Sequence, residues 1–142
     1  MSIFFAEPRR TRGGQRSGSI YLHPFARRRT SSEALGASKE VGEMLEEQDR
    51  EGRMVAAVCA APTALASHKI GVGSNVTSYP APAFIEKLES AGYKYMDDNV
   101  VVDKNIVTSR GPGTSFNFAL EIVKILVSQE KSEEVRKAML VE

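Results

Sequence analysis

The chain has 142 residues, of which 42% are hydrophobic, enough for one globular domain with an apolar core. No apolar stretch reaches the roughly 18 residues that would span a membrane, and one cysteine excludes an internal disulfide or a thiolate zinc cluster. With no recognisable secretory signal, these features predict a reducing intracellular compartment: the cytoplasm, with the mitochondrion and the nucleus as alternatives.

The net charge of +1 hides an uneven distribution along the chain. Residues 1–32 contain seven arginines and one glutamate, a net charge of +6, whereas the remainder has 12 basic and 17 acidic residues, a net charge of −5. Glycine and proline interrupt any periodicity in residues 1–32, which predicts a basic disordered tail. Its Arg-rich, acid-poor composition also fits a mitochondrial transit peptide. Nucleic-acid binding is disfavoured, because no interleaved aromatic residues or known module accompany the arginines.

Residues 33–142 alternate helix and strand signals in chain order. Helices are expected at 38–50, from the turn after Cys59 to His68, around 84–88 with an end at Gly92, after a cap at Thr114, and at 132–140. Strands are expected at 54–58, 75–78 and 93–95, with a hairpin formed by 99–102 and 106–109. This alternation predicts an α/β fold, a layered sheet with flanking helices.

The single cysteine, Cys59, follows a short apolar run and precedes small residues and Pro62. Proline suits the first turn of a helix, so the pattern predicts a buried strand, a tight elbow and a helix, with sulfur at the turn. The positive end of the helix dipole favours thiolate over thiol there. Cys59 is therefore a candidate nucleophile or redox sensor, and a packed core cysteine is the alternative.

Three stretches carry a family resemblance: VCAAPT at 58–63, VTSYP at 76–80 and TSRGPGTSF at 108–116. In this order they resemble the DJ-one branch of the ThiJ/PfpI superfamily, from about residue 32 to the C-terminus. The resemblance implies a flavodoxin-like sheet, a homodimer and a reactive cysteine on a nucleophile elbow. It also implies oxidative-stress protection, redox-dependent chaperone behaviour, and glyoxalase or deglycase activity on methylglyoxal and its adducts. No cofactor is implied.

The chain also departs from the family pattern. Nothing in it resembles the strand–helix–strand unit that begins a complete member. That unit supplies the glutamate that hydrogen-bonds the cysteine sulfur and a Gly-Gly loop of the anion site. Tyr79 stands where some members have a histidine, and Ala61 where many have glycine. We therefore expect a truncated form with an unrelated tail over 1–32 and a partial family domain over 33–142.

Loss of the first strands has a physical consequence. A sheet edge without hydrogen-bond partners favours aggregation or pairing with another chain. We expect the apolar faces of the strands at 54–58 and 106–109 to be exposed unless a partner covers them. That partner is expected to be a second copy or another edge-pairing chain.

The candidate site contains few residues. Cys59 is the expected catalytic residue, the backbone N–H of Ala60 the expected oxyanion donor, and Arg110 a candidate anion contact. A structural bond between Arg110 and the loop at 111–113 is an equally strong interpretation. No metal site is expected, because the histidines and Asp97–Asp98 lack ligand spacing. His68 is expected to be a helix-end or surface residue.

Two functional hypotheses remain open. In the first, Cys59 adds to a small aldehyde and forms a hemithioacetal that rearranges to a hydroxy acid. The missing glutamate weakens this hypothesis, so whether the chain is an enzyme stays open. In the second, the chain is a non-enzymatic chaperone or interaction protein that responds to oxidation of Cys59, or a non-functional truncated isoform.

Overall fold

The computed structural model describes residues 3–5 and 30–141. In chain order its elements are β1 (Ile3–Phe5), α1 (Ser31–Ala37), α2 (Lys39–Arg50), β2 (Val55–Val58), α3 (Pro62–His68), β3 (Asn75–Val76), α4 (Pro82–Ser90), β4 (Lys94–Tyr95), β5 (Val100–Asp103), β6 (Ile106–Ser109), the 3-10 turn η1 (Pro112–Thr114), α5 (Ser115–Leu126) and α6 (Gln129–Ala138). The predicted α/β class is confirmed. No helix in the described part of the chain has the length and apolar character needed to cross a membrane.

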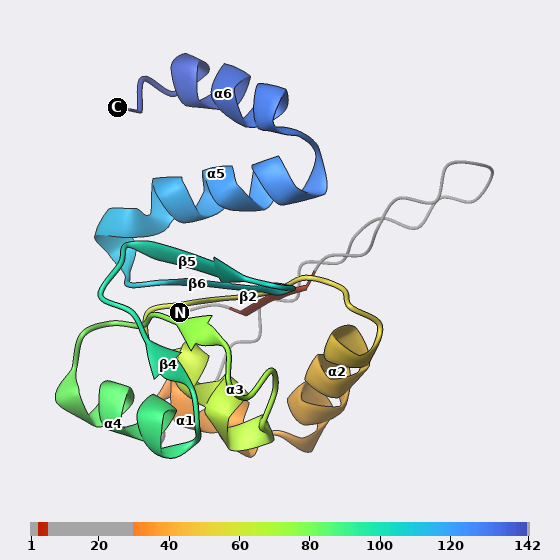
Figure 1. Ribbon diagram of the computed structural model, residues 1–142, viewed down its shortest axis with the longest axis vertical. Helices are drawn as coiled ribbons and strands as arrows, with labels where there is room; N and C mark the ends of the chain where they lie inside the picture. The colour runs from red at the N-terminus through yellow and green to blue at the C-terminus, as the bar shows by residue number, and fades with distance from the viewer. Residues whose placement is uncertain (1–2, 6–29, 142) are drawn as a thin grey trace.

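The strands form a four-stranded sheet in the order β1-β2-β6-β5, with β3 and β4 as a separate parallel pair. β2 pairs in parallel with β6, and the predicted hairpin is present as antiparallel β5 and β6. Figure 1 shows α5 and α6 on one side of the sheet and α1 to α4 on the other. The sheet is therefore covered by helices on both faces, which parallel pairing requires.

Alternation along β2 divides the core into two parts, because successive side chains of a strand point to opposite faces. Val55 and Ala57 join the larger cluster, which includes Leu65 of α3 and Leu88 of α4. Ala56 faces the other way, in a smaller cluster with Val107 of β6 and Phe118 of α5. The strand that leads to Cys59 is thus packed on both faces, and this packing fixes the position of the elbow at the end of β2.

The expectation of an uncovered edge beside the cysteine strand is wrong. β1 pairs antiparallel with β2, with Phe4 opposite Ala56, so β2 has a neighbour on each side. The apolar faces expected to be exposed are buried: Val55 and Val107 have no exposed surface, and Ile106 is 1% exposed. Residues 1–2 and 6–29 of the expected tail lie outside the described residues.

Helix α1 was not predicted, and it begins two residues before the expected domain boundary at 33. Its capping box is complete: the Thr30 hydroxyl accepts from the Glu33 N–H, and the Glu33 carboxylate accepts from the Thr30 N–H at 2.9 Å. The capping box thereby gives the backbone N–H groups of Thr30 and Glu33 hydrogen-bond partners at the start of the helix. The expected cap at Thr114 is wrong in its chemistry. Thr114 precedes α5, but its hydroxyl donates to the Gly111 carbonyl rather than capping the helix.

Buried polar bonds join β3 to the main sheet. The backbone N–H of Thr77 donates to the Thr108 hydroxyl at 2.9 Å, and the Asp103 carboxylate accepts from the N–H and side-chain amide of Asn75. Nearby, the Tyr93 hydroxyl donates to the Ile70 carbonyl. Burial first, and then the charge of Asp49, raises the pKa of Tyr93 far above its usual range, so this phenol stays protonated. The bond between Thr77 and Thr108 thus holds the segment after β3 against β6, and the Asp103 bonds hold β3 against β5.

Candidate active site at the Cys59 elbow

Cys59 lies directly after β2 in a strained backbone conformation. Its φ is +67°, a left-handed value that costs a non-glycine residue about 1–2 kcal/mol. Two backbone bonds impose it: the Cys59 N–H donates to the Ser109 carbonyl at 2.9 Å, and its carbonyl accepts from the Tyr79 N–H at 2.8 Å. The elbow predicted from the sequence is therefore present, and its side chain is partly exposed. Strain of this kind concentrates at functional sites and sharp strand-to-helix turns.

The backbone after Cys59 turns directly into α3. Ala61 is the N-cap residue, with Pro62 in the first turn, as the sequence predicted. The N–H groups of Ala61 and Thr63 donate to the carbonyls of Val58 and Ala60. No carbonyl of the described residues accepts from the N–H of Ala60. The Ala60 N–H belongs to the residue that directly follows Cys59 in the chain.

Tyr79 and the loop after β6 border the elbow. Tyr79 is 49% exposed, and a Cβ built on Gly111 would lie 3.6 Å from its ring carbon Cδ2. The loop is held internally, because the Thr114 hydroxyl bonds both backbone groups of Gly111 and lies 2.6 Å from the Ser109 hydroxyl. An aromatic ring and a fixed loop thus lie next to the residues that hold the Cys59 backbone.

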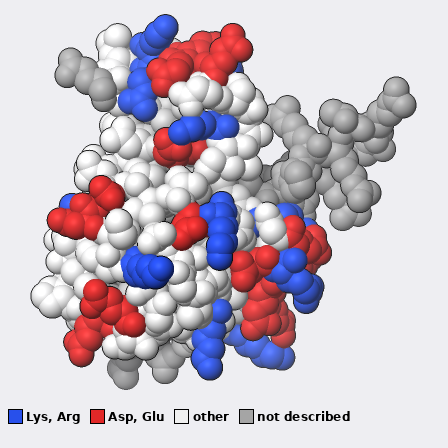
Figure 2. Space-filling view, in the orientation of Figure 1, with Lys and Arg blue, Asp and Glu red and all other residues white. Residues whose placement is uncertain are grey.

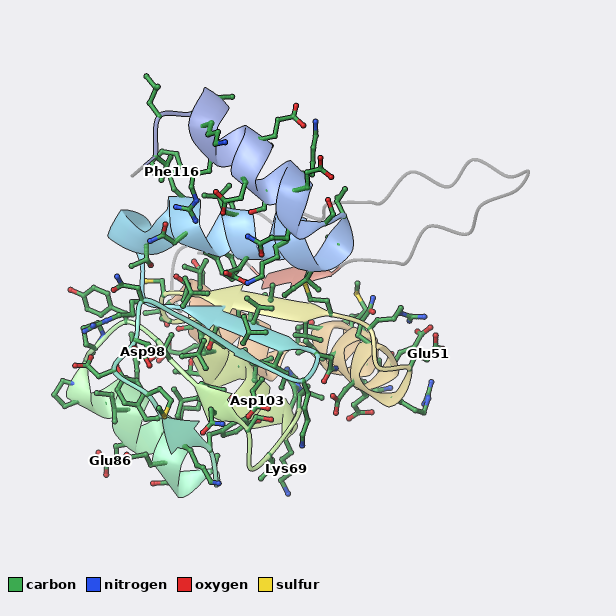
Figure 3. The ribbon with its side chains drawn as sticks, turned by 45° about the horizontal axis from the view of Figure 1, so that its top comes forward. Glu51, Lys69, Glu86, Asp98, Asp103 and Phe116 are labelled. Carbon is green, nitrogen blue, oxygen red and sulfur yellow. The ribbon has the colours of Figure 1, made fainter. Side chains whose placement is uncertain are left out.

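Arg110 does not bond the loop at 111–113. Its guanidinium Nη1 lies 3.0 Å from the Asp97 carboxylate, and its backbone N–H donates to the Asn99 carbonyl. Sequence patterns identified Asp97 only as turn chemistry and gave no sign of this ion pair. Figure 3 shows the neighbouring Asp98 at the end of the sheet where β6 runs into η1. The segment before β5 therefore supplies an acidic partner beside the elbow.

The remaining candidates lie away from the sulfur. His68 ends α3, seven residues that extend about 10 Å from the elbow, and its Nε2 lies 2.9 Å from the Leu35 carbonyl. This bond ties α3 to α1. His68 thus ends its helix as expected, but it is a partly buried link between two helices rather than a cap or a surface residue. Within residues 3–5 and 30–141, no side chain hydrogen-bonds the Cys59 sulfur. The same residues contain no group of three His, Cys, Asp or Glu side chains able to hold a metal ion.

Comparison with known proteins places these features in context. A family model described as the DJ-1/PfpI family matches residues 29–125. The protein dj-1beta of Drosophila melanogaster is 46% identical over 113 residues, which cover 78% of this chain and 58% of that protein. A crystal structure of Drosophila DJ-1beta superposes with a TM-score of 0.73 over 78% of this chain and 59% of that one.

A second relative carries an enzymatic name. The glutathione-independent glyoxalase DJR-1.2 of Caenorhabditis elegans is 42% identical over 99 residues, 70% of this chain and 52% of that protein. The chain thus spans between half and three fifths of the length of these curated relatives.

Proposed function

The chain belongs to the DJ-1/PfpI family, and on this premise we propose that it is a redox-sensitive cysteine protein of oxidative-stress protection. Its Cys59 thiolate would react with peroxides and with small aldehydes such as methylglyoxal. One observation carries the proposal: Cys59 occupies a strained elbow fixed by backbone bonds to Ser109 and Tyr79. A packed core cysteine has no need of that conformation.

The aldehyde chemistry would begin at the sulfur. The thiolate attacks the aldehyde carbon, a C–S bond forms, and the carbonyl electron pair moves to oxygen. The N–H of Ala60 would stabilise this oxyanion, which becomes a hemithioacetal after it takes up a proton. Glyoxalase turnover then needs a proton moved from C1 to C2, followed by hydrolysis of the resulting lactate thioester, so that methylglyoxal and water give lactate. The name of the nematode relative supports this chemistry.

The proton transfer limits turnover. No carboxylate of the described residues hydrogen-bonds the Cys59 sulfur, so none of these carboxylates is placed to act as the acid–base group of the hemithioacetal. We predict little conversion of methylglyoxal to lactate. The measurement is a lactate assay with the nematode glyoxalase as a reference and Cys59→Ser as the matched blank. Turnover near the rate of the reference, lost in Cys59→Ser, would contradict the prediction.

Oxidation of Cys59 by a peroxide needs no acid–base group for proton transfer. The thiolate attacks a peroxide oxygen, the O–O bond breaks, and a sulfenate and water result. We predict that Cys59 of the folded chain is oxidised faster than the same thiol of the chain unfolded in urea. Mass spectrometry after mild peroxide measures both, and because the chain has one cysteine every added oxygen on a thiol reports this site. Equal rates in the folded and unfolded chains would remove the sensor function.

A second candidate function is a redox-responsive chaperone or interaction protein. The observation that favours it is a set of exposed apolar side chains on and next to the C-terminal helices α5 and α6. Its exposed members are Phe116, Ile125, Leu126, Val127, Met139 and Leu140. Surfaces of this kind commonly bind another protein, and we propose a second copy of this chain or an unfolded client as the partner. This function would survive Cys59→Ser in the reduced state, whereas the thiol chemistry would not.

A further inference from the structure

An ion pair lies beside the residue that carries the thiol. Arg110 Nη1 and Asp97 Oδ1 are 3.0 Å apart, with the Arg110 side chain 28% exposed and that of Asp97 78% exposed. Arg110 immediately follows Ser109, whose carbonyl holds the Cys59 N–H. The pair is therefore tied to the same backbone that positions the elbow.

The strand register places Arg110 alongside Cys59. Val58 is the partner of Ser109 in the parallel pair of β2 and β6, so the next residues of the two chains, Cys59 and Arg110, leave the sheet side by side. The backbones of neighbouring strands lie about 4.8 Å apart, and charges act over roughly 10 Å in 0.1 M salt. Arg110 is therefore the cationic residue that the register places beside Cys59, and its charge can act on an ion approaching the thiol if no other group cancels it.

We propose that Asp97 sets the charge selectivity of Cys59. By pairing with Arg110, its carboxylate cancels the positive charge beside the thiol, so neutral carbonyl compounds react in preference to anionic ones of similar size. Methylglyoxal is neutral, whereas glyoxylate presents a carboxylate next to its aldehyde. This inference rests on the proposed reactivity of Cys59, and it assigns the choice of electrophile to a residue that never touches it.

The charges on the surface in view are mixed in sign. Figure 2 shows acidic and basic side chains interspersed over the face in view, with no broad region of one sign among the described residues. Asp98 is adjacent in sequence to Asp97, but no ion pair joins it to a cation of the described residues. Asp98 is thus a matched control: its neutralisation changes the net charge equally and leaves the Arg110 pair intact.

The test uses two thiol reagents that differ in charge, on the full chain. In each reaction the Cys59 thiolate attacks a reagent sulfur, the S–S bond breaks, a mixed disulfide forms and one thiolate leaves. The anionic reagent is dithiobis(nitrobenzoate) and the neutral one is dithiodipyridine. In Asp97→Asn we expect the ratio of the anionic to the neutral rate to rise about three- to fivefold at low salt, as an exposed charge interaction allows. The rise should shrink in 1 M salt, and it should be absent in Asp97→Asn/Arg110→Gln.

Each alternative result overturns the proposal. An equal rise in Asp98→Asn would mean that net charge alone acts, and a rise that persists without Arg110 would exclude the pair. No reaction with either reagent would exclude an accessible thiol. These reagents measure the approach to sulfur without turnover. A failed lactate assay would therefore not overturn the role of Asp97. Likewise, if Asp97→Asn left the ratio of the anionic to the neutral rate unchanged, the peroxide reactivity of Cys59 would still hold.

Discussion

Replacing Leu65 by alanine is expected to lower the free energy of unfolding by about 2–5 kcal/mol, the range for a buried leucine truncated in a core. Leu65 belongs to α3, has no exposed surface, and packs in the larger cluster with Val55 of β2 and Ile106 of β6. Its loss leaves a cavity between the helix that follows the elbow and the strands that hold it. Urea unfolding followed by circular dichroism measures the change.

The matched control for this substitution is Leu126→Ala. Leu126 ends α5 and is 47% exposed, so the same chemical change should alter the free energy of unfolding by at most about 0.5 kcal/mol. Similar losses in the two variants would contradict the core assignment. A small loss for both would mean that α3 does not pack on the sheet.

Thr108→Val should lower the free energy of unfolding by about 1–3 kcal/mol, although the two side chains have nearly the same shape. The Thr108 hydroxyl accepts the backbone N–H of Thr77 at 2.9 Å, and both residues are fully buried. Valine offers no acceptor, so a buried donor between β3 and β6 would lose its partner. The variant therefore measures the bond that joins the second strand pair to the main sheet.

Thr77→Val should not lower the free energy of unfolding, although Thr77 is the hydrogen-bond partner of Thr108. The Thr77 hydroxyl is buried and has no hydrogen-bond partner among the described residues, so replacing it with a methyl group removes an unsatisfied polar atom. We expect a neutral or stabilising effect in the same urea experiment. A loss equal to that of Thr108→Val would show that both hydroxyls are satisfied, and it would contradict the arrangement of this joint.

Much of the fold follows from local sequence signals, because local physics decides those elements. The helix after Cys59 was predicted to end at His68, and it does. The hairpin strands at 99–102 and 106–109 were predicted within one residue, since a turn at 103–105 separates two β-branched runs. The last helix begins at Gln129 rather than 132, because Ser128 caps it. The signal for α1 was also present: Thr30 and Glu33 have capping-box spacing.

Other features depend on contacts between distant residues. β1 is three residues long and has no periodic pattern, so only its pairing with β2 defines it as a strand. The ion pair of Arg110 and Asp97 likewise joins segments whose approach is set by tertiary packing. The sequence predicted Cys59 at an elbow because strand, turn and helix follow one another there. The charge beside the sulfur could not be predicted in that way.

The antiparallel pairing of β1 has a consequence for synthesis on the ribosome. Phe5 pairs with Val55, fifty positions later in the chain. At about 5–20 residues per second, the first strand waits about 3–10 s before its partner is made. During that interval an Ile-Phe-Phe segment leaves the ribosome with no strand to join. β1 is thus the first part of the described chain to be translated, and it can pair only after β2 of the same chain has been made.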